Sequence, residues 1–469
     1  MANKPWFPFA VFCAGLLLFV PFLGHVHLFD WDEINFAECA REMIVTHDYS
    51  TVKIGFLPFW EKPPLFIWMQ ALCMNIFGIG EFAARLPDAL CGAFTLAAVF
   101  YLGRKIYDAR FGLVWMLAFA GSVLPAFYFH SGIIDPWFNL FIFLGVYQFI
   151  VYANDFPSPS TSKLLNGRII LSALFIALAV LTKGPVALLV FGLCFVIARF
   201  RARKPIMSWK HLGLYAAVSL LIPGVWFAML ALNGKGNLIV EFLLYQVRLF
   251  STQDAGHGGS FFYHWIVLLI GCFPASVFAI TGLTRKADDT PFELFFLKWM
   301  RTLFWVVLIL FSIVQTKIIH YSSLCYFPLT FLAAYALRKF ESGSLRMKKW
   351  TLPALFLSGM IYAAAFFVLP YIDSFKHALL DSGMVKDRFA AGNLAATGHW
   401  NGSEWITGVI LLAGLVMAVL LFRRNNFQKA VTVLFVSSAV CLFTAAAFFA
   451  PRVEEYSQDA AIRYWERHA

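Results

Sequence analysis

The chain has 469 residues, of which 61% are hydrophobic and 13% are charged, and its formal net charge is +11. Soluble domains contain roughly 45–50% apolar and about 25% charged residues, so this apolar excess predicts an all-α polytopic membrane protein. The positive charge does not indicate a nucleic-acid partner, because basic residues on the cytoplasmic side of membrane helices give the same surplus. Only Cys39 of the eight cysteines lies in a polar stretch, which predicts neither a disulfide framework nor a cysteine metal site.

Apolar runs long enough to cross a bilayer follow one another along the chain, separated by short polar breaks. We expect about thirteen membrane-spanning helices, at residues 6–24, 86–106, 110–130, 136–153, 167–182, 184–200, 211–232, 263–284, 300–316, 321–338, 351–370, 405–422 and 427–449. The first run has little basic sequence before it and no small-residue cleavage site after it, so it is expected to remain as a span. The run 65–77 is too short to cross and is expected to form a partly embedded helix after Pro63 and Pro64.

Lysine and arginine residues are concentrated in alternate loops, most clearly as RFRARK at 199–204. Because such loops stay in the cytoplasm, this distribution predicts a cytoplasmic N-terminus in the cytoplasmic (inner) membrane. One transmembrane domain, 1–450, then carries its longest loops on the external, periplasmic side, at 25–85, 233–262 and 371–404, where juxtamembrane helices are expected. The external tail, 451–469, is expected to form one amphipathic helix on the membrane surface.

The first external loop contains a polar segment, 30–64, in a chain that is otherwise mostly apolar. After Asp30 and Asp32, apolar residues recur at helical spacing, with Glu38 and either Arg41 or Glu42 on the other face. An aspartate at this helix start either caps the free amides of the first turn or serves as a general base held at the membrane surface.

The same loop ends in FWEKPP, where Glu61 and Lys62 lie between aromatic and proline residues. The pair is either an interfacial lysine with its neighbouring acid, or a lysine that binds a lipid phosphate. In the second case the glutamate orients the lysine or serves as a metal ligand.

Ionisable residues recur at the external ends of later helices. They are Asp135, Lys183, and Lys317 with His320 and Tyr321 in one turn. Charge so close to the hydrocarbon is costly and marks a functional site by default, although an aspartate before a proline is also a common helix start. Together with Asp32, Glu61, Lys62 and Arg248, these residues outline one mixed-charge site on the external face.

The loop 233–262 contains the stretch EFLLYQVRLF, which is expected to form a short amphipathic helix carrying Arg248. The glycine-rich segment after it is not a phosphate-binding loop, because it follows no strand and lacks the Walker lysine. His257 in that segment is either simply exposed or a ligand that joins Glu61 around a divalent ion.

Several short motifs, taken as a set, resemble those of the membrane glycosyltransferases of the C superfamily. They are Asp-Glu followed by AxxxREM in the first external loop, a Glu-Lys-Pro-Pro tetrad, a helix that opens with Asp-Pro, an LTKG break and a QxKxxxY turn. The likeness extends to about residue 340. It is greatest to the bacterial branch related to aminoarabinose transferase and to the protein O-mannosyltransferases, whose helix number agrees with the thirteen expected above.

The resemblance implies transfer of a sugar from a polyprenyl-phosphate donor at the outer membrane surface, with inversion at the anomeric carbon. It implies that Asp32 is the loop carboxylate, that Lys62 binds phosphate and that Glu61 can approach a divalent metal. Arg248 and Tyr321 match the loop arginine and the turn tyrosine.

Two departures from the family pattern bear on the substrates. An aromatic hydroxyl often found just before the Glu-Lys pair is replaced by Phe59 and Trp60, so one hydrogen bond to phosphate is missing or moved. The large soluble C-terminal domain of some relatives is also not expected here. The acceptor is therefore left open among lipid A, another glycolipid, a polysaccharide unit and a protein.

Displacing a phosphate from a sugar builds negative charge on the leaving oxygen, which preplaced cations stabilise. Lys62 and Arg248, with Lys183 or Lys317, are the candidates for this role. No organic cofactor is expected, and the partners are the lipid-linked donor, the acceptor and the membrane lipids.

On the opposite side a carboxylate takes the proton of the acceptor, and inversion needs only one such base. We assign the base to Asp32, with Glu33 and Asp135 as reserves. The alternatives are a lipid or sugar transporter or flippase, and a non-catalytic scaffold. A transporter usually places charges near the membrane midplane, whereas here the centres of nearly all predicted spans lack them.

Overall fold

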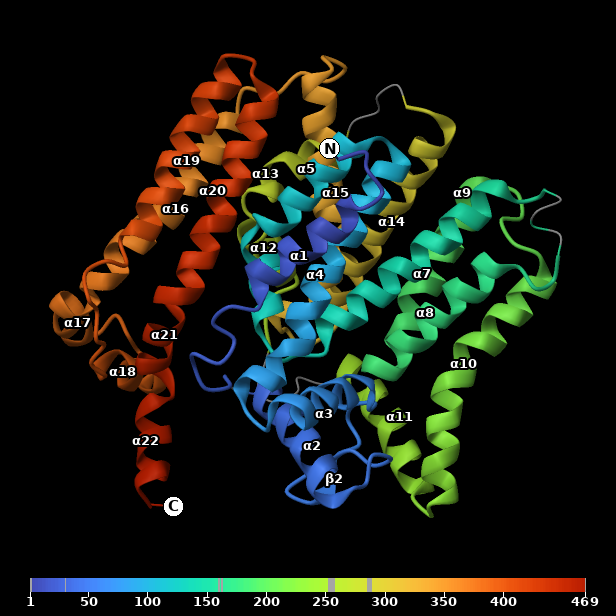
Figure 1. Cartoon of the computed structure of the whole chain (residues 1–469), viewed down its shortest axis with the longest axis horizontal. Coiled ribbons are helices and arrows are strands. Elements are labelled where there is room, and N and C mark those ends of the chain that lie inside the picture. Colours follow the sequence, from blue (N-terminus) through green and yellow to red (C-terminus); the bar gives the residue numbers. More distant parts are fainter. Residues whose placement is uncertain are drawn as a thin grey trace.

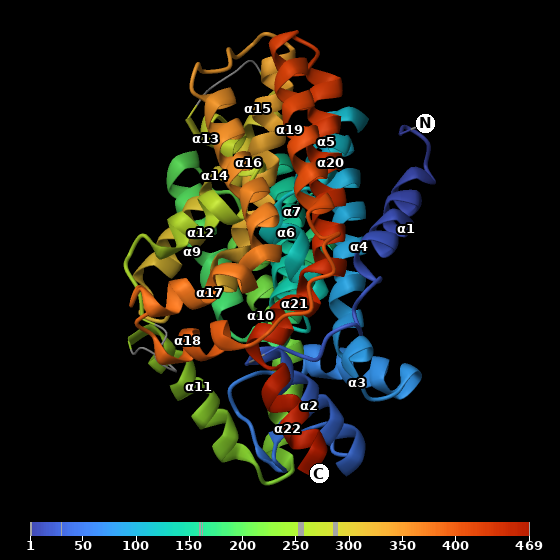
Figure 2. The same cartoon turned by 90° about the vertical axis from the view of Figure 1, so that its left-hand side faces the viewer.

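The computed structural model describes residues 2–29, 31–158, 161, 163–251, 258–284 and 289–468. These residues are helical almost throughout, and they form a tilted bundle with a group of shorter helices at one end (Figure 1). Figure 2 shows that the N-terminus and this group of shorter helices lie at opposite ends of the molecule.

In the described part of the chain, seven helices are long and apolar enough to cross a membrane, or nine if each of two bent pairs is one span. The seven are α4 (Glu81–Ile106), α7 (Asp135–Asp155), α10 (Trp209–Leu232), α14 (Pro291–Ile313), α16 (Thr351–Val368, continuing to Asp381), α19 (Ile406–Arg423) and α20 (Phe427–Phe448). The bent pairs are α5 (Ala109–Ala120) with α6 (Val123–Phe127) and η1 (Tyr128–His130), at 83°, and α12 (Tyr263–Gly271) with α13 (Ala275–Thr284), at 119°. The prediction of a multi-pass helical membrane protein is therefore confirmed.

Four further apolar helices of the bundle are shorter. They are α1 (Phe7–Phe19), α8 (Gly167–Lys183), α9 (Val186–Ala202) and α15 (Tyr326–Glu341). Each of the thirteen expected apolar runs overlaps one of these helices, one of the long helices or one bent pair. Only seven to nine spans are long and apolar enough in the described residues, so the count of thirteen is not confirmed. Helices α16, α19 and α20 pack together on one side of the bundle, and α7, α8 and α10 on the other (Figure 1).

Five of the bundle helices begin with a side-chain cap, which satisfies backbone N–H groups that have no partner inside the helix. The capping residues are Asp108, Asn166, Ser208, Thr290 and Asn426. Each cap lies in or next to a loop that the lysine and arginine distribution assigns to the cytoplasm. The local sequence thus sets where these helices start.

The elements expected outside the membrane gather at the end opposite the N-terminus (Figures 1 and 2). They are α2 (Asp32–Thr46), the hairpin β1 (Lys53–Ile54) and β2 (Leu57–Pro58), α3 (Leu65–Phe77), α11 (Gly236–Ser251), η5 (Leu369–Tyr371), α17 (Ile372–Asp381), α18 (Arg388–Ala395), α21 (Ala450–Ser457) and α22 (Asp459–His468). The short helix at 65–77 is present as predicted. The tail forms two helices where one was expected.

Helix α2 buries one face against α3, as its apolar spacing predicts. Phe36, Ala40 and Met43 are buried, and the Phe36 ring meets the Phe66 ring edge to face with 6.1 Å between centroids. Glu42 differs from the expectation because it lies on the buried face. Its Oε2 accepts a hydrogen bond of 2.8 Å from the backbone N–H of Phe56, which ties the β hairpin to the helix.

The start of α11 is anchored to the first external loop. Lys235 Nζ lies 3.1 Å from Asp48 Oδ2 and donates a 2.6 Å hydrogen bond to the Thr51 hydroxyl. The Trp226 indole at the end of α10 donates to the Ser50 carbonyl at 3.0 Å. These contacts hold the corner between α10 and α11, and thereby the approach of α11 to the first loop.

Candidate active site

A cavity of about 970 Å³ opens at the end of the bundle where the first loop and α11 lie. It lies between the first loop, α11, η4 (Ile319–Cys325) and the junction of α20 with α21. Its polar lining includes Asp32, Glu61, Lys62, Lys183, Lys317, His320 and Tyr321. The fold therefore brings to one cavity most of the residues that were predicted to form a mixed-charge external site.

Two carboxylates converge on one histidine beside this cavity. His320 Nε2 lies 3.3 Å from Asp32 Oδ2 and 3.7 Å from Asp135 Oδ2. Asp135 is buried, and its other oxygen accepts a 2.5 Å hydrogen bond from Lys183 Nζ, which also lies 4.8 Å from the centroid of the Tyr321 ring. A buried carboxylate requires such a charge partner. We call these five residues the carboxylate cluster.

Asp32 is the first residue of α2, but it does not cap the helix. The N-cap position is Trp31, and no side chain caps this helix end. Burial raises the pKa of Asp32, but the contact with His320 and the charges of Lys62 and Lys183 outweigh it and lower the pKa to about 2. Asp32 is thus an ionised carboxylate on the cavity wall, 27% exposed.

A second group of residues forms where the first loop meets α11. Lys62 Nζ lies 3.6 Å from Glu61 Oε2 and 3.5 Å from the hydroxyl of Tyr245, to which it donates. Lys62 Nζ and Arg248 Cζ each lie 5.1 Å from the centroid of the Tyr245 ring. We call Lys62, Tyr245 and Arg248 the cation cluster. Two cations and a phenol are suited to hold a phosphate.

Glu33, a reserve candidate for the base, has a structural role. It forms a two-pronged ion pair with Arg85 of α4, with both N···O distances 2.8 Å, and it is almost fully buried. Its two oxygens also accept from the backbone N–H groups of Gly132 and Phe29, each at 2.7 Å. With four donors on its two oxygens, this carboxylate is committed to contacts that hold the fold together.

Lys317, a candidate phosphate ligand, instead closes the end of α14. Its Nζ donates to the carbonyl oxygens of Phe311, Ser312 and Val314 at 3.0, 2.8 and 2.5 Å. These three bonds use all three N–H groups of the ammonium and satisfy carbonyls that the helix leaves unpaired. Lys317 therefore lines the cavity without presenting an N–H to it.

Only one of the two residues expected to bind a metal ion lies in the described part of the chain. Glu61 lies at the cavity beside Lys62, but His257 lies outside the described residues. Within the described residues, no three His, Cys, Asp or Glu side chains are grouped so that they could hold a metal ion. Glu61 alone does not form a metal site.

The sequence patterns assign no role to two residues of the site. His320 stands out in the sequence only as part of a turn with Lys317 and Tyr321, yet it contacts both Asp32 and Asp135. Tyr245 lies in an apolar stretch, but it precedes Arg248 by three residues and therefore lies on the same helix face. That spacing is the signal that could have identified it.

A multi-pass helical bundle with carboxylates and cations around one external cavity is the architecture of the membrane glycosyltransferases that the motifs resemble. Comparisons with known proteins confirm this resemblance. Residues 61–227 match the family of dolichyl-phosphate-mannose-protein mannosyltransferases.

Among curated proteins, the chain is 27% identical to undecaprenyl phosphate-alpha-4-amino-4-deoxy-L-arabinose arabinosyl transferase 1 of Proteus mirabilis, over 72% of this chain and 60% of that protein. It is 26% identical to the transferase of the same name from Serratia proteamaculans, over 90% of this chain and 72% of that protein. The chain thus spans about three fifths of the length of the first of these relatives.

The crystal structure of ArnT from Cupriavidus metallidurans bound to undecaprenyl phosphate has the same fold. It aligns with a TM-score of 0.73 and 21% identity, over 97% of this chain and 78% of that one. The same protein in the apo state aligns with a TM-score of 0.71. The chain therefore has the ArnT fold.

Proposed function

We propose that this protein is a glycosyltransferase that transfers a sugar from an undecaprenyl-phosphate-linked donor to an oxygen of an acceptor, with inversion at the anomeric carbon. The observation that carries the proposal is that an ionised Asp32 lines the same cavity as Lys62 and Tyr245 of the cation cluster. The names of the relatives, which act on an undecaprenyl-phosphate-linked sugar, support the choice of donor.

In this proposal the cation cluster holds the donor phosphate. Lys62 and Arg248 supply positive charge next to the Tyr245 ring, and the phenol supplies a hydroxyl. When the bond between the anomeric carbon and the phosphate oxygen breaks, the electron pair goes to that oxygen. The cations are already in place to stabilise the new charge, so little reorganisation is needed.

The acceptor oxygen attacks the anomeric carbon from the side opposite the phosphate, and Asp32 takes its proton. One carbon–oxygen bond forms as the other breaks, so a single base is enough for an inverting transfer. His320 orients the carboxylate through its Nε2 contact at 3.3 Å. Lys183 neutralises Asp135 on the far side of the histidine, which supports the same arrangement.

The proposed topology has thirteen spans, formed by the seven long helices, the two bent pairs and the four shorter apolar helices. The N-terminus is then cytoplasmic and the cavity faces the periplasm, in the inner membrane. The basic loops between helices support this orientation. A divalent ion near Glu61 remains part of the proposal. Its test is whether a chelator changes binding of undecaprenyl phosphate by the wild-type protein but not by a Glu61→Gln variant.

Mass spectrometry of membrane lipids and envelope glycans, with and without the protein, tests the transfer. A mass difference of one sugar on lipid A, on another glycolipid, on a polysaccharide or on a protein supports the proposal and identifies the acceptor. Transport of lipid in vesicles without any glycosylated product contradicts it and favours a flippase.

A further inference from the structure

We infer that α21, the first helix of the C-terminal tail, is a positioning element of the active site. Through Glu454 and Gln458 it fixes the segment 23–29, which leads directly into α2 and Asp32. The kinetic part of this inference rests on the proposed sugar transfer, whereas its structural part does not.

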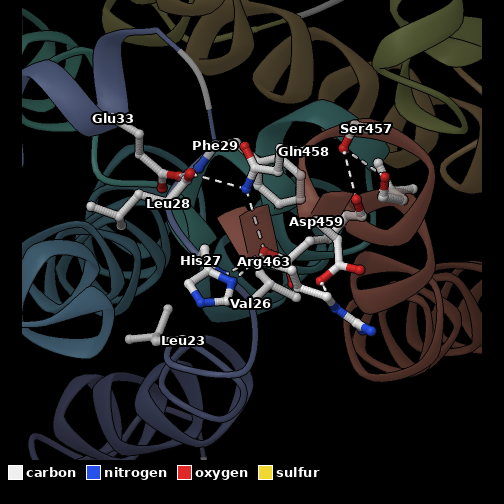
Figure 3. Close-up of polar contacts among 12 residues, drawn as sticks. Leu23, Val26, His27, Leu28, Phe29, Glu33, Ser457, Gln458, Asp459 and Arg463 are labelled. Carbon is white, nitrogen blue, oxygen red and sulfur yellow. Dashed lines mark hydrogen bonds and ion pairs between the residues drawn. The ribbon is translucent and has the colours of Figure 1, made fainter. Parts of the chain in front are cut away.

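The contacts with the segment come from α21 and from Gln458, the residue that follows it, which lies beside Leu28 in Figure 3. Glu454 Oε1 accepts a hydrogen bond of 2.8 Å from the backbone N–H of His27 and lies 2.8 Å from His27 Nδ1. One turn later, Gln458 Nε2 donates to the Leu28 carbonyl at 3.1 Å. The main chain of the segment is therefore bound directly by side chains of the tail.

The other side of the segment is held by the buried pair of Glu33 and Arg85. Arg85 donates to the carbonyl oxygens of Leu23, Val26 and His27, each at 2.8 Å. Residues 26–29 have no regular secondary structure, so these side chains supply partners that a helix or sheet would otherwise provide. The segment is thus clamped between α4 and α21.

This clamp bears on the cavity because the segment ends three residues before Asp32. Val26 and Phe29 line the cavity, and so do Ala446 and Ala450 at the junction of α20 and α21. A shift of the segment would therefore move both the wall of the cavity and the start of α2. A displacement of about 1 Å at a reacting group is enough to lower a rate by about 10²-fold.

Helix α21 is itself fixed by contacts on its other face. The Tyr456 hydroxyl donates to Asp373 Oδ1 at 2.7 Å, and Glu455 Oε2 accepts from the backbone N–H of His399 at 2.7 Å. Arg452 lies 3.7 Å from the buried Glu404. Because these contacts are independent of Glu454, removing its side chain should release the segment without detaching the helix.

Hydrogen–deuterium exchange of the full chain tests the structural part. In Glu454→Ala, a peptide covering residues 23–31 should exchange at least about tenfold faster, because the His27 amide loses a charged acceptor. Glu454→Gln keeps an acceptor oxygen and should retain protection. The matched control is Arg463→Ala, which breaks an exposed ion pair on α22. Unchanged exchange in Glu454→Ala, or an equal rise in the control, overturns the inference.

Kinetics test the positioning of Asp32. Glu454→Ala should lower kcat for sugar transfer at least about tenfold while the affinity for undecaprenyl phosphate stays within about twofold, and Glu454→Gln should restore kcat. A loss of lipid affinity with kcat unchanged contradicts the positioning role. If the wild-type protein transfers no sugar, the proposed function fails, and the exchange experiment still decides whether α21 holds the segment.

Discussion

His320 Nε2 lies 3.3 Å from Asp32 Oδ2, so the carboxylate proposed as the base is held by a side chain that can itself carry positive charge. Against the effect of burial, this contact lowers the pKa of Asp32 to about 2. A carboxylate with so low a pKa stays ionised but has little affinity for a proton, and a general base works best when its pKa is near the operating pH. His320 therefore ensures the ionised form and limits its basicity.

Replacing His320 by Asn should move the acid limb of the transfer rate to higher pH. Without the imidazole, the pKa of Asp32 rises toward or above the ordinary value of about 3.9, so the base becomes protonated at a higher pH than in the wild-type protein. The rate should be measured from pH 3 to pH 8, a range in which the variant should show an acid limb and the wild type should not. If the variant also shows no limb, His320 does not tune Asp32.

Asp32→Asn should abolish transfer while leaving the protein folded. General base catalysis contributes about 10²–10⁴-fold to a rate, so the variant should lose at least about two orders of magnitude in kcat. Binding of undecaprenyl phosphate should persist, because the cation cluster is intact. The control is Glu38→Gln on the same helix, whose carboxylate pairs with Arg41. Full activity in Asp32→Asn would contradict the assignment of Asp32 as the base.

Tyr245→Phe should weaken binding of undecaprenyl phosphate by about 10-fold or more, because a hydrogen bond to a charged group contributes about 1.5–3 kcal/mol. Its hydroxyl lies 3.5 Å from Lys62 Nζ, and we propose that it supplies the phosphate hydrogen bond that Phe59 and Trp60 do not provide. Native mass spectrometry can measure the binding. Tyr464→Phe on the exposed face of α22 is the control and should bind as the wild type does. Equal affinities for both variants would remove Tyr245 from the phosphate site.

The helices could be predicted because each apolar run and each cap is a local pattern, as Asn166 and Ser208 illustrate. For the site, the sequence predicts only that the charged residues lie on the same side of the membrane. No local pattern states that His320 meets Asp32, because packing of segments that are distant in the sequence decides this contact. The same holds for Glu33, whose partner Arg85 lies in another helix. The lysine of the same turn as His320, Lys317, binds nearby carbonyls at the end of α14, and the residue types alone do not distinguish this role from phosphate binding.

Glu33→Gln should destabilise the protein by about 3–5 kcal/mol, because it leaves the buried Arg85 guanidinium without a charge partner. The loss should appear as a lower unfolding temperature in detergent. Glu38→Gln, which removes a partly exposed ion pair with Arg41, should change stability by at most about 1 kcal/mol. Similar losses of stability in Glu33→Gln and Glu38→Gln would show that the buried Glu33–Arg85 pair stabilises the fold no more than the partly exposed pair does.

The anchor of α11 should make binding of the donor lipid sensitive to acid. Burial raises the pKa of Asp48, but hydrogen bonds from Ser50, Lys53 and Lys235, with the charge of Lys235, lower it well below the ordinary 3.8. A carboxylate whose pKa is lowered on folding stabilises the folded protein at any pH above its pKa in the unfolded chain. This stability is lost as the pH falls toward and through its pKa in the folded protein. Below about pH 4 the anchor therefore weakens progressively.

Asp48→Asn should remove this acid-dependent contribution and loosen the start of α11 at neutral pH. We expect the fall in unfolding temperature between pH 5 and pH 3 to be smaller in the variant than in the wild type. Affinity for undecaprenyl phosphate should also drop, because Tyr245 and Arg248 lie on α11. Asp459→Asn on α22, which also loses an ion pair, should keep the wild-type pH dependence. If Asp48→Asn also keeps the wild-type pH dependence of the unfolding temperature, the anchor at Asp48 does not set the position of α11.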